Sequence, residues 1–309
     1  MREFFKKFLR EHKRQVIIFS FFRIFSFAQI LFWPYAFSKV INIISQNPEN
    51  WREATFWAGL MILNKITEDV VRLRSKFGLE KIASRLKISM ATFLSEETKI
   101  RKGKKTGEAV QAIKKASEDL ESLVASYKNE ALQLPINLIA IPLILLQTNI
   151  AYLILLIIYG VLYLTIDYFT VKAYRKKLKI YFKAAEIFWG TTYRKTPEIW
   201  RQREDGDTFA HQIEKEGEKL YKAIISSNNA NNWRWVLLQT LSSASLGAAV
   251  LFALYRVVIL GAPVGDLILV SAYFRETQGT LNIITSAVTR IIQTKISLKR
   301  LDEAVKSKN

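Results

Sequence analysis

The fold is decided by residues 131–166, which read ALQLPINLIAIPLILL at 131–146, QTN at 147–149 and IAYLILLIIYGVLYLTI at 150–166. Neither apolar run contains an ionised side chain. A helix that crosses a bilayer needs roughly 20 mostly apolar residues, because the hydrocarbon core is about 30 Å thick. The stretch therefore predicts a helical hairpin that crosses a membrane and returns, turning on the three polar residues at 147–149.

The composition of the whole chain fits apolar spans that continue into charged helices. Apolar residues make up 50% of the chain and charged residues 24%, and the mean hydropathy is only +0.08. The net charge is +19, but basic proteins that bind nucleic acid do not carry uncharged runs of bilayer length, so no nucleic-acid partner is expected. The chain has no cysteine and only two histidines, His12 and His211, so neither a disulfide nor a metal site is expected.

Hydropathy along the rest of the chain predicts an all-α polytopic membrane protein with six transmembrane helices and two long cytoplasmic helical extensions. The spans are expected at about 16–44, 51–64, 131–146, 150–166, 233–260 and 266–295. The extensions are expected at about 65–130 and 172–232, with one break in each, at 99–107 and at Thr196-Pro197. Together these elements form one domain at 16–309, in which the second span has the weakest signal.

The first 15 residues form a separate feature, in which phenylalanines oppose lysines and arginines. This pattern is typical of an amphipathic helix that lies at a membrane surface, although a plain basic flank of the first span is the alternative. Basic residues near spans favour the cytoplasm. Because they concentrate at the N-terminus and in the two extensions, both termini and both extensions are expected inside, in a protein of the cytoplasmic (inner) membrane.

A polar stripe on the last span is the main candidate site. Its members recur at spacings of 3, 4, 3 and 4, which places them on one helical face, with Glu276 beside them: Arg275, Gln278, Asn282, Thr285 and Thr289. Arg275 lies about 13 Å into the span at 1.5 Å per residue, where an ionised group costs roughly 2.5–3.5 kcal/mol unless it faces protein or water. The stripe predicts the wall of a substrate cavity, and the alternative is a buried ion pair that only fixes packing.

Other charged residues lie in or near the spans. Arg23 in the first span either joins the cavity or extends its head group back to the inner lipid surface. The group Lys65, Glu68, Asp69 and Arg72 has the spacing of ion pairs on a solvated helix. Asp167 is expected at the inner interface of the fourth span.

Six spans with two such excursions resemble the transmembrane domain of ABC exporters (the type IV fold), and the resemblance covers essentially the whole chain. The segments that carry it are Glu3–Leu9, similar to the elbow helix of the family; Thr106–Glu108 and Ser117–Leu120, after the first coupling helix; Glu186–Gly190 and Ile199-Trp200, around the second; and Ser297–Asp302, at the end of the sixth helix. The chain departs from the family at Ala116, where an aspartate is frequent.

The resemblance implies the partners and the coupling sites. Two such chains, identical or different, enclose one translocation pathway, and ATP-driven ATPase subunits or domains switch it. Short coupling helices near Leu94–Arg101 and Thr192–Trp200 dock on those ATPases. The candidate coupling residues are Phe93, Leu94, Ser95, Glu96, Thr196, Ile199 and Trp200.

The chain itself is not expected to bind ATP or any other cofactor. ATP binding needs a phosphate loop of the form GxxxxGK[ST], in which a lysine follows the last glycine. At the candidate last glycine of this chain, Gly107, the next residue is Glu108 and not a lysine. No catalytic residues are expected, and ATP and Mg are expected on an ATPase carried by another polypeptide. The alternative function is a membrane scaffold that kept the fold without transport. A secondary transporter is disfavoured, because no inverted repeat is found, and the sequence does not indicate a substrate.

Overall fold

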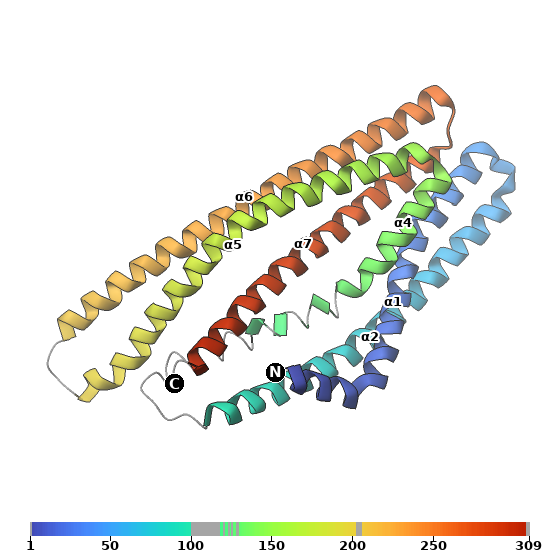
Figure 1. Ribbon diagram of the computed structural model, residues 1–309. Coiled ribbons are helices and arrows are strands. Elements are labelled where there is room, and N and C mark those ends of the chain that lie inside the picture. The colour runs from blue at the N-terminus through green and yellow to red at the C-terminus, as the bar shows by residue number, and fades with distance from the viewer. Residues whose placement is uncertain are drawn as a thin grey trace. The chain divides into compact units, whose positions relative to one another are not determined.

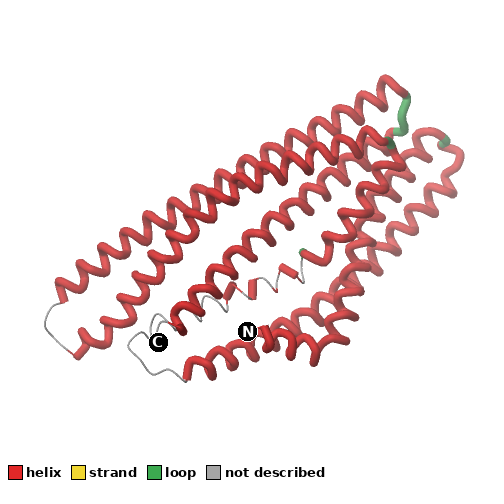
Figure 2. The backbone as a smooth tube through the Cα atoms, in the orientation of Figure 1, coloured by secondary structure: helices red, strands yellow, loops and turns green. Residues whose placement is uncertain are grey.

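The computed structural model describes residues 2–99, 118–119, 121–122, 124, 126–127, 130–201 and 206–306. The α-helices of this part of the chain are α1 (Arg2–Gln46), α2 (Trp51–Lys99), α4 (Leu134–Thr148), α5 (Ile150–Arg201), α6 (Gly206–Leu260) and α7 (Val264–Lys306) (Figure 1). Two short 3-10 helices, η1 (Pro48–Asn50) and η2 (Ala131–Gln133), complete the order. No described residue lies in a strand, as Figure 2 shows.

The chain divides into two compact units. Unit 1 consists of Met1–Ser84, Ala125–Thr165 and Leu238–Ser286, and unit 2 consists of Arg85–Val124, Ile166–Leu237 and Ala287–Asn309. Each of four helices is divided between the two units: α2, α5, α6 and α7. The predicted spans fall mainly in unit 1 and the predicted extensions mainly in unit 2.

Four helices of the described chain are long and apolar enough to cross a membrane: Lys7–Gln46, Ala131–Thr148, Ile150–Thr192 and Ala210–Leu260. They contain the first, third, fourth and fifth predicted spans. The other two predicted spans lie in α2 and α7. The apolar stretch in α2 is short and is followed by Lys65 and Glu68, and the stretch in α7 is interrupted by Arg275 and Glu276.

The hairpin at 131–166 turns on one residue instead of three. The helix α4 continues through Gln147 and Thr148, and the Thr148 hydroxyl donates to the Ile144 carbonyl at 3.0 Å. Asn149 alone is extended, with φ −168° and ψ 135°, and its N–H donates to the Leu145 carbonyl at 2.8 Å. Its side-chain Oδ1 accepts from the Ala151 N–H at 2.9 Å. Asn149 therefore ends α4 and caps α5.

The α6–α7 turn depends on two glycines. Gly261 has φ +64°, which L side chains rarely adopt. The N–H of Gly265 donates to Oδ1 of Asn42 at 2.6 Å, and a Cβ at position 265 would overlap the Ser38 carbonyl oxygen. The start of α7 therefore lies directly against the backbone of α1. In Figure 1 the α1–α2, α4–α5 and α6–α7 connections, all in unit 1, lie at the same end of that unit.

The core of unit 1 joins five helices. Buried side chains from α1, α4, α5, α6 and α7 pack in one cluster, which includes Leu31, Leu145, Tyr152, Ala253 and Tyr273. Polar bonds cross this core, because a buried polar group needs a partner: the Tyr273 hydroxyl donates to the Leu31 carbonyl at 2.7 Å. The helix α2 packs on α1 through a smaller cluster that contains Phe27 and Leu79.

One face of α5 in unit 1 exposes a continuous set of large apolar side chains. Each of them is about half exposed or more: Ile150, Ile154, Ile157, Ile158, Val161 and Leu162. A water-soluble monomer rarely exposes an apolar patch of this kind. The face fits a surrounding of lipid or of partner helices.

Unit 2 has its own core. Tyr174, Leu178 and Phe182 of α5 pack with Ala230 of α6 and with isoleucines of α7. Asp119 is buried against α7, where its carbonyl accepts from Thr294 Oγ1 at 3.2 Å and its carboxylate accepts from Ser297 Oγ. Asp119 belongs to the segment that carried part of the family resemblance.

The structure corrects one predicted break, and the other lies almost entirely outside the described residues. The break at Thr196-Pro197 is wrong, because α5 continues through both residues to Arg201. A proline removes one intrahelical hydrogen bond, and α5 continues for four residues beyond Pro197 in spite of this loss. The helix α2 is described as far as Lys99, and residues 100–107 of the first predicted break lie outside the described residues. At the N-terminus the amphipathic segment and the first span form one helix, α1.

Candidate functional site

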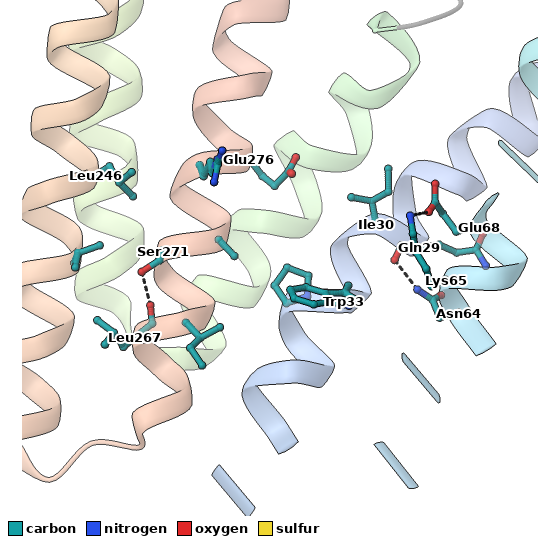
Figure 3. A pocket seen from close by; sticks show the side chains of 15 residues that line it. Gln29, Ile30, Trp33, Asn64, Lys65, Glu68, Leu246, Leu267, Ser271 and Glu276 are labelled. Carbon is teal, nitrogen blue, oxygen red and sulfur yellow. Dashed lines mark hydrogen bonds and ion pairs between the residues drawn. The ribbon is translucent and has the colours of Figure 1, made fainter. Parts of the chain in front are cut away.

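A pocket of about 840 Å³ lies within unit 1. Its lining comes from two pairs of consecutive helices, α1 with α2 near the N-terminus and α6 with α7 near the C-terminus. Figure 3 shows Gln29, Ile30 and Trp33 of α1 around it, together with side chains of α2 and α7. The full lining is Gln29, Ile30, Trp33, Pro34, Asn64, Lys65, Glu68, Leu246, Val250, Leu267, Ile268, Ser271, Ala272, Arg275 and Glu276. The pocket therefore combines an apolar wall with charged and amide groups.

The α1–α2 side of the pocket is fixed by two hydrogen bonds. The amide of Asn64 donates to the Gln29 carbonyl at 2.9 Å, and the amide of Gln29 donates to Oγ1 of Thr67 at 2.8 Å. An amide within a span is costly unless it is paired. Gln29 and Asn64 were not singled out from the sequence. The signal that could have identified them is the position of each as a polar residue within or at the end of an apolar stretch.

A ladder of ion pairs follows on α2. Lys65 Nζ lies 2.5 Å from Glu68 Oε2 and 3.3 Å from Asp69 Oδ1, and Arg72 contacts the same two carboxylates at 3.3 and 2.6 Å. The predicted i,i+3 and i,i+4 pairing is confirmed, but the prediction of a solvated face is wrong for Glu68. Its side chain is 2% exposed, whereas that of Lys65 is 55% exposed. The Glu68 side chain is therefore buried although it lines the pocket together with Lys65.

Arg275 and Glu276 of α7 line the same pocket. Arg275 is exposed to it, and Glu276 is half-buried and accepts from the Gln133 amide at 3.3 Å. Among the described residues, no ion pair joins Arg275 to Glu276. The bond to Gln133 holds the Glu276 carboxylate next to the start of α4.

The other members of the predicted stripe contact neighbouring helices. Gln278 donates to Gln239 Oε1 at 2.6 Å, and the Tyr163 hydroxyl donates to Asn282 Oδ1 at 2.7 Å. Thr285 is fully buried in unit 1. The last member of the stripe, Thr289, belongs to unit 2. Their assignment to a substrate cavity stays a prediction.

Arg23 is not part of the pocket lining. It is 7% exposed, and its guanidinium carbon lies 4.6 Å from the centre of the Phe27 ring. A cation over an aromatic face in a desolvated site is stabilised by the ring quadrupole. Within the described chain, its Nε and Nη1 atoms have no hydrogen-bond partner.

The predicted coupling residues lie near the ends of α2 and α5. Phe93 is half-buried in α2. The backbone of six others continues these helices, but their side chains lie outside the described residues: Leu94, Ser95, Glu96, Thr196, Ile199 and Trp200. Their contact with an ATPase stays a prediction.

A buried ion pair in unit 2 joins three helices, and sequence reasoning missed it. Nε and Nη2 of Arg234 both lie 2.7 Å from Oδ1 of Asp167, and Nη1 donates to Thr289 Oγ1 at 2.7 Å. The Arg234 side chain is 0% exposed and that of Asp167 is 8% exposed. The expected position of Asp167 at the inner membrane interface stays a prediction, and within the protein its carboxylate is buried against Arg234. No group of three potential metal ligands gathers in the part of the chain that the structure describes.

Comparison with known proteins defines the class of fold. No protein-family model matches the chain, and no curated protein matches it. Among solved structures, it is similar to a bacterial Atm1-family ABC exporter with ATP bound, with a TM-score of 0.82 over 96% of this chain at 13% sequence identity. The chain covers 54% of that protein, so it spans about half of its length.

The fold is that of the transmembrane domain of an ABC exporter, as the sequence resemblance predicted. The protein is therefore of the all-α polytopic membrane class. At this low identity the similarity concerns the fold alone.

Proposed function

We propose that the chain is the membrane-spanning part of an ABC exporter and forms its translocation pathway. The observation that carries the proposal is the similarity to the solved exporter over 96% of the chain. The solved exporter holds ATP, whereas the 309 residues of this chain contain no phosphate loop. ATP hydrolysis is therefore assigned to ATPase domains or subunits outside these residues.

The pocket of unit 1 is the proposed part of the pathway that this chain contributes. Its apolar wall, with Trp33 and Leu246, suits the apolar part of a solute, and the charged groups of Arg275 and Glu276 suit a polar part. A pocket that combines an apolar wall with a few placed polar groups is typical of ligand sites. A second chain of the same kind, identical or different, completes the pathway in this proposal.

The two proposed coupling segments, near Leu94–Arg101 and Thr192–Trp200, transmit the state of the ATPases. ATP binding shifts the population between an inward-open and an outward-open pathway only if it favours one of the two. Long continuous helices such as α2 and α5 suit this role, because a packed helix moves as a rigid element. The protein is proposed to lie in the inner membrane, with both termini and both extensions in the cytoplasm.

The test is joint purification with a candidate ATPase, followed by reconstitution into vesicles. We expect the chain alone to bind no ATP, and the complex to show ATPase activity that responds to a transported solute. Alanine substitutions at Phe93, Leu94, Ile199 and Trp200 are expected to separate ATP turnover from transport while the protein still inserts. An ATPase that copurifies while no solute moves would favour the membrane scaffold, and tight ATP binding by the chain alone would contradict both functions.

A further inference from the structure

We propose that unit 2 contains a binding site for an anionic phospholipid of the inner leaflet. The site is a groove of about 680 Å³ between α5 and α7, here called the basic groove. Its lining consists of five cations and three isoleucines: Arg175, Lys179, Lys183, Lys295 and Lys299, with Ile291, Ile292 and Ile296. Among the described residues that line it, none carries a carboxylate.

The cations form two facing rows because of helical periodicity. Arg175, Lys179 and Lys183 recur every fourth residue on α5, and Lys295 and Lys299 do so on α7. All five side chains are exposed. An anion placed between the rows would be attracted by the side chains of both helices. Glu186, one turn beyond Lys183 on α5, lies outside the lining.

The base of the groove is rigid. Tyr174, Leu178 and Phe182 alternate with the basic residues along α5 and are buried against Ile292 and Ile296. In addition, the Gln293 amide donates to the Tyr174 hydroxyl at 3.4 Å. The two rows are therefore held apart by packed side chains, and a ligand enters a site that is largely formed beforehand.

The position of the groove along the helices selects a lipid over a free anion. At 1.5 Å per residue, Arg175 lies about 38 Å along α5 from Ile150, and Ile291 lies about 40 Å along α7 from Val264. A bilayer measures about 40–45 Å with its headgroups. With the short turns placed outside, the groove starts at the inner headgroup layer and continues just beyond it. Basic pockets between transmembrane helices on this side bind anionic headgroups.

The isoleucines give the second reason for a lipid. Ile291 is 55% exposed beside the cations, and an exposed apolar side chain next to a charged row suits an amphiphile. The phosphate would contact the lysines and Arg175, while the glycerol and the first methylenes would cover the isoleucines. A free polyphosphate has no part that would cover them.

The experiment measures lipid binding by the full chain in a mild nonionic detergent. The chain is titrated with phosphatidylglycerol, with phosphatidylcholine and with inorganic pyrophosphate, and bound molecules are counted by native mass spectrometry alongside the melting temperature. The groove variant is Arg175→Gln/Lys179→Gln/Lys183→Gln. The matched control is Lys172→Gln/Lys176→Gln/Lys177→Gln, which removes the same charge from exposed positions of α5 outside the lining.

We expect phosphatidylglycerol to bind and to raise the melting temperature, and phosphatidylcholine to do neither. Each basic residue near an anionic surface contributes about a fivefold factor in affinity, so the groove variant should bind roughly 100-fold more weakly. The control variant should bind like the original chain. The pair Lys295→Gln/Lys299→Gln should also weaken binding, which guards against a fold defect in the triple variant.

Three outcomes would overturn the proposal. Equal losses in the groove and control variants would mean attraction by the general surface charge. Equal binding of phosphatidylcholine would mean that the headgroup charge is not recognised, and tighter binding of pyrophosphate would assign the groove to a free anion. The position of the groove at the inner headgroup layer depends on the proposed orientation of the protein in the membrane. The binding assay needs neither an ATPase nor transport, so an absence of lipid binding can be distinguished from a failure of the proposed transport function.

Discussion

The guanidinium of Arg234 in α6 and the carboxylate of Asp167 in α5 form a buried ion pair, in which two nitrogens converge on one oxygen at 2.7 Å. The third nitrogen donates to Thr289 of α7. The pair therefore connects three helices of unit 2 through one side chain that water does not reach. A buried charge is tolerated when its partner and its remaining donors are satisfied.

Removal of one partner of this pair is expected to lower the stability of the protein strongly. Asp167→Asn leaves the buried Arg234 charge without its partner, and Arg234→Leu leaves the Asp167 carboxylate without its donors. Each variant should lower the free energy of unfolding by about 3–5 kcal/mol. The double variant should cost less than the sum of the two single variants. The measurement is the melting temperature in detergent for all members of the cycle. The exposed pair Lys222–Glu218, at 3.4 Å, is the control, and its loss should cost about 0–1 kcal/mol.

The close approach of α7 to α1 gives a second prediction. Gly265→Ala places a methyl group against the Ser38 carbonyl, which is backbone and has little room to move, so we expect a loss of about 1–3 kcal/mol. Gly160→Ala and Gly247→Ala are the controls, because nothing lies within 4 Å of a Cβ at either position. They should be neutral or stabilising. Equal melting temperatures for the 265 variant and the controls would contradict the contact.

Arg275 tests the assignment of the pocket. Because it is exposed to the pocket and has no ion pair with Glu276 among the described residues, Arg275→Ala should impair transport or change the preferred solute at little cost in stability. A destabilisation of roughly 3–5 kcal/mol would instead indicate a buried charge pair. Ile284→Leu, off the polar stripe, is the control and should be nearly silent. Transport per folded molecule is the deciding measurement.

Two further residues of the polar stripe, Asn282 and Thr285, are tested by substitutions that would narrow the translocation pathway. If Asn282 and Thr285 line the pathway, Asn282→Leu and Thr285→Leu should reduce transport more than they reduce stability. Asn282→Leu also removes the acceptor of the Tyr163 hydroxyl, so a purely structural role predicts a lower melting temperature with normal transport per folded molecule. The two readouts separate the roles.

Orientation in the membrane is tested with single cysteines, for which a chain without cysteine is suited. Basic residues favour the cytoplasm, so a membrane-impermeant thiol reagent applied to intact cells should label a cysteine at Asn50 but not at Lys104 or Lys215. Permeabilised cells, in which all three should react, provide the control. Labelling at Lys104 or Lys215 in intact cells would reverse the proposed orientation.

The sequence predicts the helices better than the contacts between them. Uncharged runs identify the hairpin at 131–166 because burial in lipid excludes ionised groups. The length of its turn was less predictable, since Thr148 satisfies its hydroxyl within α4 and does not end the helix. Likewise Pro197 reads as a break but is tolerated one turn before the end of α5.

The candidate site was predicted only in part for a related reason. Helical period places Arg275 and Asn282 on one face, but it does not say which neighbour that face meets. Asn282 meets Tyr163, and Arg275 meets the pocket. The pairing of Arg234 with Asp167 joins residues 67 positions apart, and local patterns carry no information about contacts over such a separation.

The contacts between α1 and α7 restrict how unit 1 can change shape. Asn42 accepts from the Gly265 amide, and the Leu31 carbonyl accepts from the Tyr273 hydroxyl, so two bonds tie these helices together, about three turns apart on α1 and about two on α7. Two separated hydrogen bonds oppose both sliding and rotation of one helix against the other. We therefore expect these segments of α1 and α7 to move together, and a rearrangement of the pocket to come mainly from α2 or α6.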